Sequence, residues 1–441
     1  RRTMTLSVWI KGSSLADGSN NVLGQYNSSN ENNAMLLVIE GAGKIMVWNY
    51  TTDAYTMDIR TNRLLKDPSA WYHIVVAVDT TQGTDSNRVK IYVNGVQETS
   101  FATATYPSQN LELFMNQNKA QNIGTQRYGS TVGSPFDGYM AEFCFIEGTQ
   151  NAPTDFGEFD DSGIWKPIDV SGLTFGTNGY YLDFEDSSAL GNDVSGNDND
   201  FTTVNLAAID QSTDTCTNNF CTMNALDNFY AASTLSEGNL KVLTISGNAA
   251  YNPATFGLTK GKWYWEVKLV TCSAGDNSEA TIIGISNQSP VNAGYTGSIV
   301  VNDGLGIRGD GNAWGADGSA GGGASTSGWD AIAVGNTAMI AVDFDNGKLY
   351  HGINGTWGNS GDPTSGSTGT GAYAFTVGTD AWFPGVNQRE TSQTATFELN
   401  FGSPPYAISS GNTDGDGYGN FEYAVPSGYF SLNTKNLAEY G

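Results

Sequence analysis

Hydrophobic and polar residues alternate along most of the first 160 residues. The segment TMTLSVWI at residues 3–10 follows the two-residue period of a half-buried strand, and WYHIVVAVD at residues 71–79 has the composition of a core strand. Residues 88–93 form another such segment and lead into Asn94 and Gly95, a dipeptide that favours a tight hairpin turn. Many short strands separated by turns, without an amphipathic helix, predict a β-sandwich or barrel.

A second series of strand-like segments occupies the second half of the chain. It includes GKWYWEVK at residues 261–268 and AMIAVDFD at residues 338–345. Between the two series, residues 161–235 are crowded with Asp, Asn, Ser and Gly. We therefore expect an all-β chain of two jelly-roll-type antiparallel sandwiches, residues 1–160 and residues 236–441 with a C-terminal tail, joined by an acidic, irregular connector.

Composition and charge narrow the possible partners. The chain has 45 acidic and 20 basic residues among 441, a formal net charge of −25. This balance argues against binding to nucleic acid or an anionic membrane, because both attract clusters of Lys and Arg. No apolar run approaches the ~18 residues of a membrane-spanning helix. The chain starts at Arg1 with neither Met nor a secretory signal, so we expect it to be part of a longer product.

Each of the two series contains segments that resemble those of a known family. TLSVWI (5–10), WYHIVVAVD (71–79), IYVNG (91–95) and FDGYMAE (136–142) resemble a LamG-like jelly roll of the concanavalin A type. GKWYWEV (261–267), IGIS (283–286), VDFDNGKL (342–349), NG (354–355) and FPGV (383–386) are similar, in this order, to a SPRY domain.

The combination of these two domains carries a further resemblance. Together with FDDSGIWKP (159–167), FCTMNALD (220–227) and the tail segment at 425–437, it is similar to structural proteins of tailed phages, especially marine ones. The resemblance implies a virion surface or fibre protein, made in the bacterial cytoplasm, that assembles with itself and with other virion proteins.

Aromatic residues in the first series are candidates for carbohydrate binding. Trp48 and Tyr50, with Tyr55 beside them, would supply an aromatic platform, and Asn116 and Asp137 in loops would supply hydrogen bonds. The alternative is that Trp48 and Tyr50 are core residues, because residues of the same parity on a strand face one way.

The second series has its own candidates for ligand binding. The SPRY resemblance implies a ligand surface formed by loops at one end of the sandwich, and Trp314, Asp317, Trp329 and Trp357 lie in such Gly-rich segments. Aromatic side chains with no strand to pack against are favoured as interface anchors. The alternative is that they pack against a neighbouring subunit or domain.

Two loops rich in Asp and Asn are candidates for calcium, which takes about six to eight oxygen ligands. Asn412, Asp414 and Asp416 alternate like the front of an EF-hand loop, but the glutamate that closes such a loop is not in register. Asp193 and Asp198 lie in the other loop. The alternative is that these residues simply form Asx turns.

Catalysis has little support in the residues. The chain has only two histidines, His73 and His351, and His73 lies in an apolar strand where a core role is favoured. Glucanases of the concanavalin type place acidic residues at alternate positions of one strand, and no such run occurs. The four cysteines form no disulfide framework.

We therefore expect a non-enzymatic protein of the virion surface that presents loops to a host-surface glycan, with Ca²⁺ as its one candidate cofactor. A purely architectural protein without a ligand is the alternative, followed by a polysaccharide-degrading enzyme.

Overall fold

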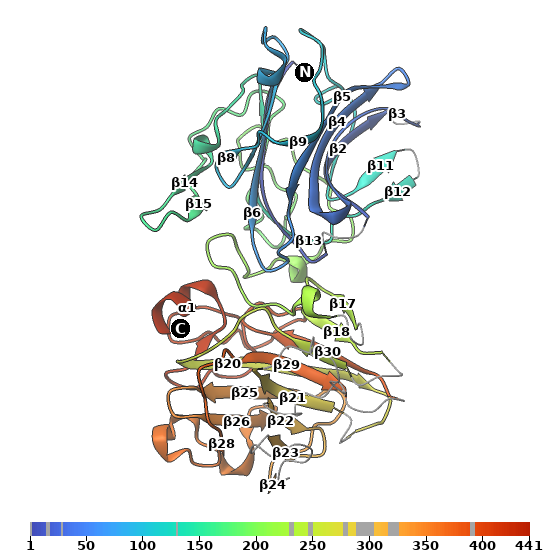
Figure 1. The fold of residues 1–441 in the computed structure, drawn as a ribbon. Coiled ribbons are helices and arrows are strands. Elements are labelled where there is room, and N and C mark those ends of the chain that lie inside the picture. The colour runs from blue at the N-terminus through green and yellow to red at the C-terminus, as the bar shows by residue number, and fades with distance from the viewer. Residues whose placement is uncertain are drawn as a thin grey trace. The chain divides into compact units, whose positions relative to one another are not determined.

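The computed structural model describes residues 2–14, 18–27, 30–128, 131–228, 233–245, 250–276, 281–287, 304–315, 326–388 and 393–441. The chain forms two compact units, Arg1–Gln211 and Ser212–Gly441, called the first and the second unit below (Figure 1). Each unit contains two large sheets whose strands are paired almost entirely antiparallel. The all-β fold class that the alternating pattern predicts is therefore confirmed.

The first unit is a sandwich of two six-stranded sheets. The β1 sheet has the order β16 (Tyr180–Leu182), β13 (Gly138–Glu147), β1 (Thr3–Gly12), β6 (Tyr72–Asp79), β7 (Val89–Val93) and β8 (Val96–Gln97). The β4 sheet has the order β10 (Gln121–Ile123), β2 (Ser19–Asn27), β3 (Asn30–Glu40), β4 (Lys44–Thr51), β5 (Ala54–Leu64) and β9 (Phe101–Thr105). Two small hairpins are β11 (Gln126–Tyr128) with β12 (Thr131–Gly133), and β14 (Gly157–Phe159) with β15 (Trp165–Pro167).

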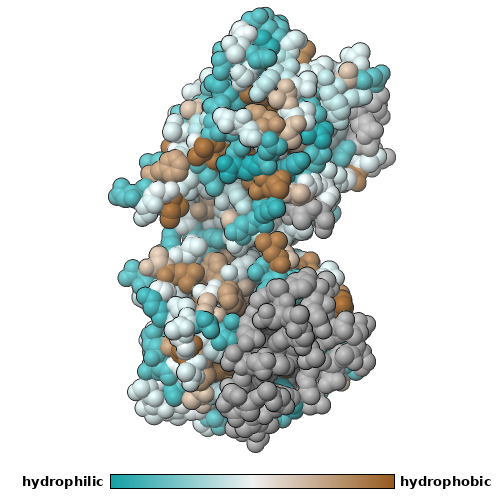
Figure 2. Space-filling model, viewed as in Figure 1, coloured by the Kyte–Doolittle hydropathy of each residue, from teal (hydrophilic) through white to brown (hydrophobic). Residues whose placement is uncertain are grey.

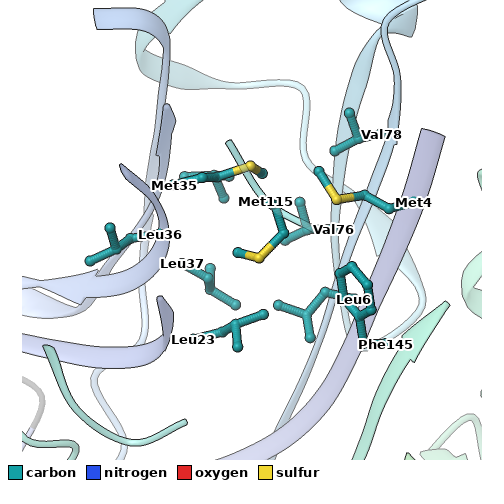
Figure 3. A pocket seen from close by; sticks show the side chains of 11 residues that line it. Met4, Leu6, Leu23, Met35, Leu36, Leu37, Val76, Val78, Met115 and Phe145 are labelled. Carbon is teal, nitrogen blue, oxygen red and sulfur yellow. The ribbon is translucent and has the colours of Figure 1, made fainter. Parts of the chain in front are cut away.

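Alternate residues of these strands fill the space between the two sheets. Leu6 and Val8 of β1 belong to the same buried cluster as Ile45 and Val47 of β4. A cavity of about 20 Å³ remains in this core. Leu, Val, Met and Phe side chains line it, with Met4 and Met115 among them (Figure 3). It has room for about one water molecule, so this cavity is too small for an organic ligand.

The β7–β8 hairpin confirms the turn that the sequence predicts. Asn94 and Gly95 have φ angles of 48° and 77°. A tight hairpin turn needs positive φ at both central residues, and Asn and Gly adopt it most readily.

The predicted connector does not form a separate segment. The boundary between the two units falls between Gln211 and Ser212, so most of residues 161–235 belongs to the first unit. Phe156, Val170 and Phe175 pack in one buried cluster with Val75 and Cys144, on the outer face of the β1 sheet. The crowding of Asp, Asn and Gly concealed these widely spaced apolar anchors, whose burial holds the irregular chain against the sheet.

Trp165 of β15 is the most closely fitted of these anchors. A Cβ atom on Gly95 would lie 2.5 Å from its ring, and one on Gly157 would lie 2.7 Å from it. Its indole Nε1–H donates to Nδ1 of His73 over 2.9 Å. The ring therefore occupies a slot that only glycines leave open.

The second unit is also a two-sheet sandwich. The β20 sheet has the order β17 (Thr234–Ser236), β18 (Lys241–Leu243), β30 (Ala395–Asn400), β20 (Lys262–Cys272), β25 (Thr337–Asp343), β26 (Lys348–Ile353) and β27 (Thr356–Trp357), with β28 (Tyr373–Ala374) beside β26 and β31 (Phe430–Ser431) beside β20. The β21 sheet has the order β19 (Ala250–Pro253), β29 (Phe383–Gln388), β21 (Thr281–Ser286), β22 (Gly304–Arg308), β23 (Asn312–Gly315) and β24 (Thr326–Ser327).

Helical structure is limited to short segments in the described residues. The α-helix α1 (Thr434–Tyr440) ends the tail, where the sequence pattern predicts none. The 3₁₀ turns are η1 (Gly41–Gly43), η2 (Asp85–Asn87), η3 (Pro153–Asp155), η4 (Ala208–Asp210), η5 (Ala225–Asp227), η6 (Gly358–Ser360) and η7 (Pro363–Thr368). Among the described residues, no helix is long and apolar enough to cross a membrane.

The C-terminal tail covers the outer face of the β20 sheet. Phe421 and Tyr429 of the tail pack with Tyr264, Met339 and Tyr350 of the sheet. The tail is thus part of the second unit's folded structure.

On the face of the molecule that Figure 2 shows, the hydrophobic residues are scattered among polar ones.

Candidate functional site

Three aromatic side chains lie together on the outer face of the β4 sheet. Trp48 and Tyr50 of β4 are half-buried, and Tyr55 of β5 is 49% exposed. The Trp48 ring meets Tyr50 and Tyr55 edge to face, with centroids 6.5 and 5.8 Å apart, and the two tyrosine rings lie 4.9 Å apart. We call these three residues the aromatic face.

The alternation of β4 explains why these rings point away from the core. Ile45 and Val47 fill the sandwich interior, so Met46 and Trp48 lie on the opposite side of the strand. Trp48 packs there against a small buried cluster on the same face, formed by Tyr26, Ala34, Leu36, Val38 and Met46. Trp48 therefore does not belong to the core between the two sheets. It is only partly covered, by the small cluster on the outer face.

A β-bulge brings Tyr55 beside Tyr50. The register of β4 and β5 shifts after Asn49, so that Tyr50 pairs with Tyr55 and Thr56 is the additional residue. Fully buried Asn49 secures the bulge, because its Nδ2 donates to Oγ1 of Thr56 over 2.7 Å and its Oδ1 accepts the backbone N–H of Phe114 over 2.7 Å. Such bulges re-aim side chains, and this one completes the aromatic face.

An ion triad borders the aromatic face. Asp58 lies directly opposite Trp48 in the strand register. Arg60 donates to both carboxylate oxygens of Asp58 over 2.9 and 3.2 Å, and to Oε1 of Glu40 over 2.9 Å. The hydrogen bonds and charge of Asp58 raise the pKa of Arg60 above its ordinary value. The surface therefore combines apolar rings with fixed hydrogen-bonding groups.

The other first-unit candidates lie elsewhere. Asn116, with φ of 62°, donates from Nδ2 to Oε1 of Glu147 in the β1 sheet over 2.7 Å. Asp137 is exposed in the loop before β13, and its backbone N–H donates to Oδ1 of Asn20. The contacts of these two residues are with groups outside the aromatic face.

The second-unit tryptophans do not form one loop surface in the described residues. Trp329 is only 8% exposed and belongs to the inter-sheet core, edge to face with His351, which corrects the expectation of an accessible loop anchor. Trp357 is half-buried on β27, edge to face with Tyr264 and Tyr350. The backbone of Trp314 belongs to β23, while its side chain and the whole of Asp317 lie outside the described residues.

Asp414, one of the residues considered for calcium, is a structural acceptor. Its Oδ1 accepts the backbone N–H groups of Asp416 and Tyr418 over 3.0 and 2.9 Å. Its Oδ2 accepts the N–H and Oγ–H of Ser431 and the Nδ2–H of Asn436. These donors connect the loop to β31 and α1, and they use the oxygen atoms that a cation would need.

The remaining calcium candidates, apart from exposed Asp198, also form hydrogen bonds with groups of the protein. Asp193 accepts the backbone N–H groups of Tyr181, Ser195 and Asn199 over 2.8, 2.9 and 2.9 Å. Asn412 donates its side-chain amide to a backbone carbonyl, Asp416 accepts the hydroxyl of Tyr440, and Asp198 is exposed with φ of 56°. Among the described residues, no group of three or more His, Cys, Asp or Glu side chains is arranged to hold a metal ion.

Both histidines are buried, one in each unit. His73 accepts the indole N–H of Trp165 at Nδ1, so its proton lies on Nε2, which donates to Ser7 Oγ over 2.8 Å. His351 is 2% exposed, and its Nδ1 has no hydrogen-bond partner. Burial lowers the pKa of each to about 3. Both are therefore neutral packing residues at neutral pH.

Comparisons with known proteins agree with the fold of the first unit. Residues 1–152 match the Laminin_G_3 family model, described as the concanavalin A-like lectin/glucanases superfamily. The concanavalin A-like part of the sequence resemblance is therefore confirmed. No curated protein sequence matches the chain significantly.

Solved structures show only distant similarity. The chain is similar to the SPRY domain of human HERC1, with 16% identity, a TM-score of 0.30, and coverage of 38% of this chain and 91% of that one. It is similar to domain 4 of AbnA, a GH43 extracellular arabinanase from Geobacillus stearothermophilus in complex with arabinotriose, with 23% identity, a TM-score of 0.26, and 34% and 63% coverage. The CBM40 of Ruminococcus gnavus IT-sialidase, bound to α2,3-sialyllactose, gives 17% identity, a TM-score of 0.25, and 31% and 71% coverage.

Sequence reasoning identified the aromatic residues of the site but missed the ion triad. Asp58 and Arg60 have the same parity on β5, which could have placed them on one face. Their position opposite Trp48 and Met46 depends on the register across the hairpin, which the bulge alters.

Proposed function

We propose that the first unit binds carbohydrate on the aromatic face, as part of a non-enzymatic surface protein. The observation that carries this proposal is the grouping of Trp48, Tyr50 and Tyr55 beside the Asp58–Arg60 pair on one sheet face. The match of residues 1–152 to a lectin-containing superfamily supports it.

The chemistry of a sugar fits this surface. A pyranose ring has an apolar face of C–H groups that packs on an aromatic ring, while its hydroxyl groups need hydrogen-bonding partners. Trp48 and Tyr55 supply the rings, and Asp58 and Arg60 supply an acceptor and donors in fixed positions because they hold each other. Pre-positioned groups lose little entropy on binding.

The wider role that we propose is that of a surface or fibre protein of a tailed-phage virion, with host-surface glycan as the ligand. The order of the two sandwich domains and the tail motifs support this role, as does a net charge of −25, which favours solubility over nucleic-acid binding. Self-assembly and contacts with other virion proteins belong to the same proposal. Immunogold labelling of virions, combined with adsorption assays, separates a host-binding protein from a purely architectural one.

Substitution of Trp48 tests the binding site. We expect Trp48→Ala to weaken binding to an immobilised panel of neutral oligosaccharides about tenfold or more, because a ring-stacking contact is lost. Trp357→Ala is the matched control, since Trp357 is also half-buried and edge to face with two tyrosines. Equal binding by wild type and Trp48→Ala, or loss only in Trp357→Ala, would reject the aromatic face as the site.

A hydrolysis assay tests the absence of catalysis. The carboxyl of Glu142 has a pKa raised chiefly by burial, as a general acid requires, but it accepts the hydroxyl of Tyr181. We expect no release of reducing ends from the panel. Hydrolysis that disappears in Asp137→Asn or Glu142→Gln would replace the binding proposal with an enzymatic one.

A further inference from the structure

The charges around the aromatic face are unevenly placed. Asp58 is directly opposite Trp48, where cross-strand side chains lie about 5 Å apart. Arg60 is opposite Met46, one outward-facing position further along. Lys44, four residues from Trp48 along β4, is about 13 Å away at ~3.3 Å per residue, which exceeds the Debye length of about 10 Å at 0.1 M salt. Arg60 is therefore the cation nearest to Trp48 on this face of the described strands.

Arg60 is already matched by two carboxylates. Its Nε and one terminal nitrogen form a two-point contact with Asp58, and its other terminal nitrogen donates to Glu40. The Arg60 side chain is 27% exposed, so it reaches solvent without being available as an unpaired charge. The three groups together carry one net negative charge.

We infer that the ligand of this face is a neutral glycan, and that the ion triad excludes acidic ones. This inference rests on the proposed function. Guanidinium groups are the preferred partners of carboxylates because they offer two parallel N–H donors. A sialic or uronic acid would have to displace Asp58 or Glu40 from Arg60, or place its carboxylate beside theirs. Like charges brought together in this way strongly disfavour a wrong partner.

The hydroxyl groups of a neutral sugar face no such conflict. An ionised carboxylate accepts several hydrogen bonds, so Asp58, whose side chain is 12% exposed, has lone pairs left after its two contacts with Arg60. A guanidinium has five N–H donors, and the contacts with Asp58 and Glu40 use three of them. The triad thus offers both acceptors and donors to a neutral polar ligand while its own charges stay paired.

Two matched pairs of probes test this inference with the full chain. The first pair is lactose and 3′-sialyllactose, and the second is trigalactose and trigalacturonate. Titration calorimetry at about 50 mM salt should show each neutral member binding about tenfold or more tightly than its acidic counterpart. Trp48→Ala should weaken binding to the neutral member about tenfold or more, which shows that the probe binds at the aromatic face.

A charge substitution tests the mechanism of exclusion. Glu40→Gln removes one of the two carboxylates on Arg60, and we expect it to narrow the preference for the neutral member severalfold. Glu158→Gln is the control, because Glu158 forms an ion pair with Lys166 on the β14–β15 hairpin, away from the aromatic face. Both changes should leave folding intact, since Arg60 keeps its two contacts with Asp58 in Glu40→Gln, and the Glu158–Lys166 pair is exposed and contributes little stability.

The outcomes are distinguishable. Acidic probes that bind as well as or better than neutral ones, through Trp48, would overturn the inference and leave carbohydrate binding in place. A preference that Glu40→Gln does not narrow would overturn the role of the triad. Binding to neither class would overturn the proposed function, and the inference with it.

Discussion

The two units differ in how they cover the apolar outer face of one of their sheets. In each unit, a segment that is not part of the two main sheets packs on this face. In the first unit, residues from the predicted connector cover the β1 sheet with apolar anchors and the Trp165 slot. In the second unit, the tail covers the β20 sheet, and buried carboxylates help to hold it.

Glu266 shows how the second unit fixes its covering segment. This residue is fully buried on β20, and its carboxylate accepts the backbone N–H groups of Glu422 and Tyr423 over 3.1 and 2.8 Å. The hydroxyl of Tyr264 and the amide of Asn400 are further donors, over 3.0 and 3.3 Å. In the second unit a fully buried carboxylate thus holds the backbone of the cover directly, whereas in the first unit the indole of Trp165 fills a slot and donates to His73.

Of the changes that test this comparison, removal of the Trp165 ring should have the largest effect on stability. We expect Trp165→Ala to lower the free energy of unfolding by roughly 3–5 kcal/mol, since the cavity cannot close and His73 Nδ1 loses its donor. Urea unfolding measures the loss. Phe159→Ala is the control, because Phe159 contacts Trp165 but is 53% exposed, and should cost less than about 1 kcal/mol. Similar losses of unfolding free energy in both variants would show that the close fit of the Trp165 ring does not hold the covering segment.

Acidification should weaken both units through their histidines. Each has a pKa of about 3 in the folded state, against about 6.5 when unfolded. As the pH falls below about 6.5, the unfolded chain binds protons that the folded chain does not, so stability falls until about pH 3. Between pH 6.5 and 5 the loss should be about 1.6 kcal/mol for each histidine.

Hydrogen exchange localises this effect. Protection of β6 should fall between pH 6.5 and 5 after correction for intrinsic rates, and His73→Gln should flatten that change while leaving β26 pH-dependent. His351→Gln should do the reverse. A β6 response unchanged by His73→Gln would assign the pH dependence to other groups.

Conversion of Glu266 to an amide should have the smallest of these effects. We expect Glu266→Gln to cost roughly 1–2 kcal/mol, since an amide NH₂ replaces an oxygen that accepts backbone N–H groups. Chemical denaturation with fluorescence detection measures this loss. Exposed Glu439→Gln on α1 should be neutral within about 0.5 kcal/mol. An equally neutral Glu266→Gln would mean that packing alone holds the tail.

The fold and part of the site were predictable from local patterns. Alternation over β1 and β6 predicted the strands, and Asn94 with Gly95 predicted the hairpin, because both signals act between residues close in the chain. Trp48 and Tyr50 were assigned to one side of their strand for the same reason. The covering segments were not predictable, since the apolar residues around Trp165 and Phe421 follow neither a strand nor a helix period that would reveal them.

The amino-acid sequence by itself determined the all-β architecture, the turn positions and the side of β4 on which Trp48 and Tyr50 stand. Only the tertiary structure decided that this side faces outward, that a bulge secured by Asn49 brings Tyr55 beside Tyr50, and that Asp58 and Glu40 neutralise Arg60. It also decided that Trp329 is core. The reason is physical: parity and turn preference are local, whereas register and burial depend on which distant strands meet.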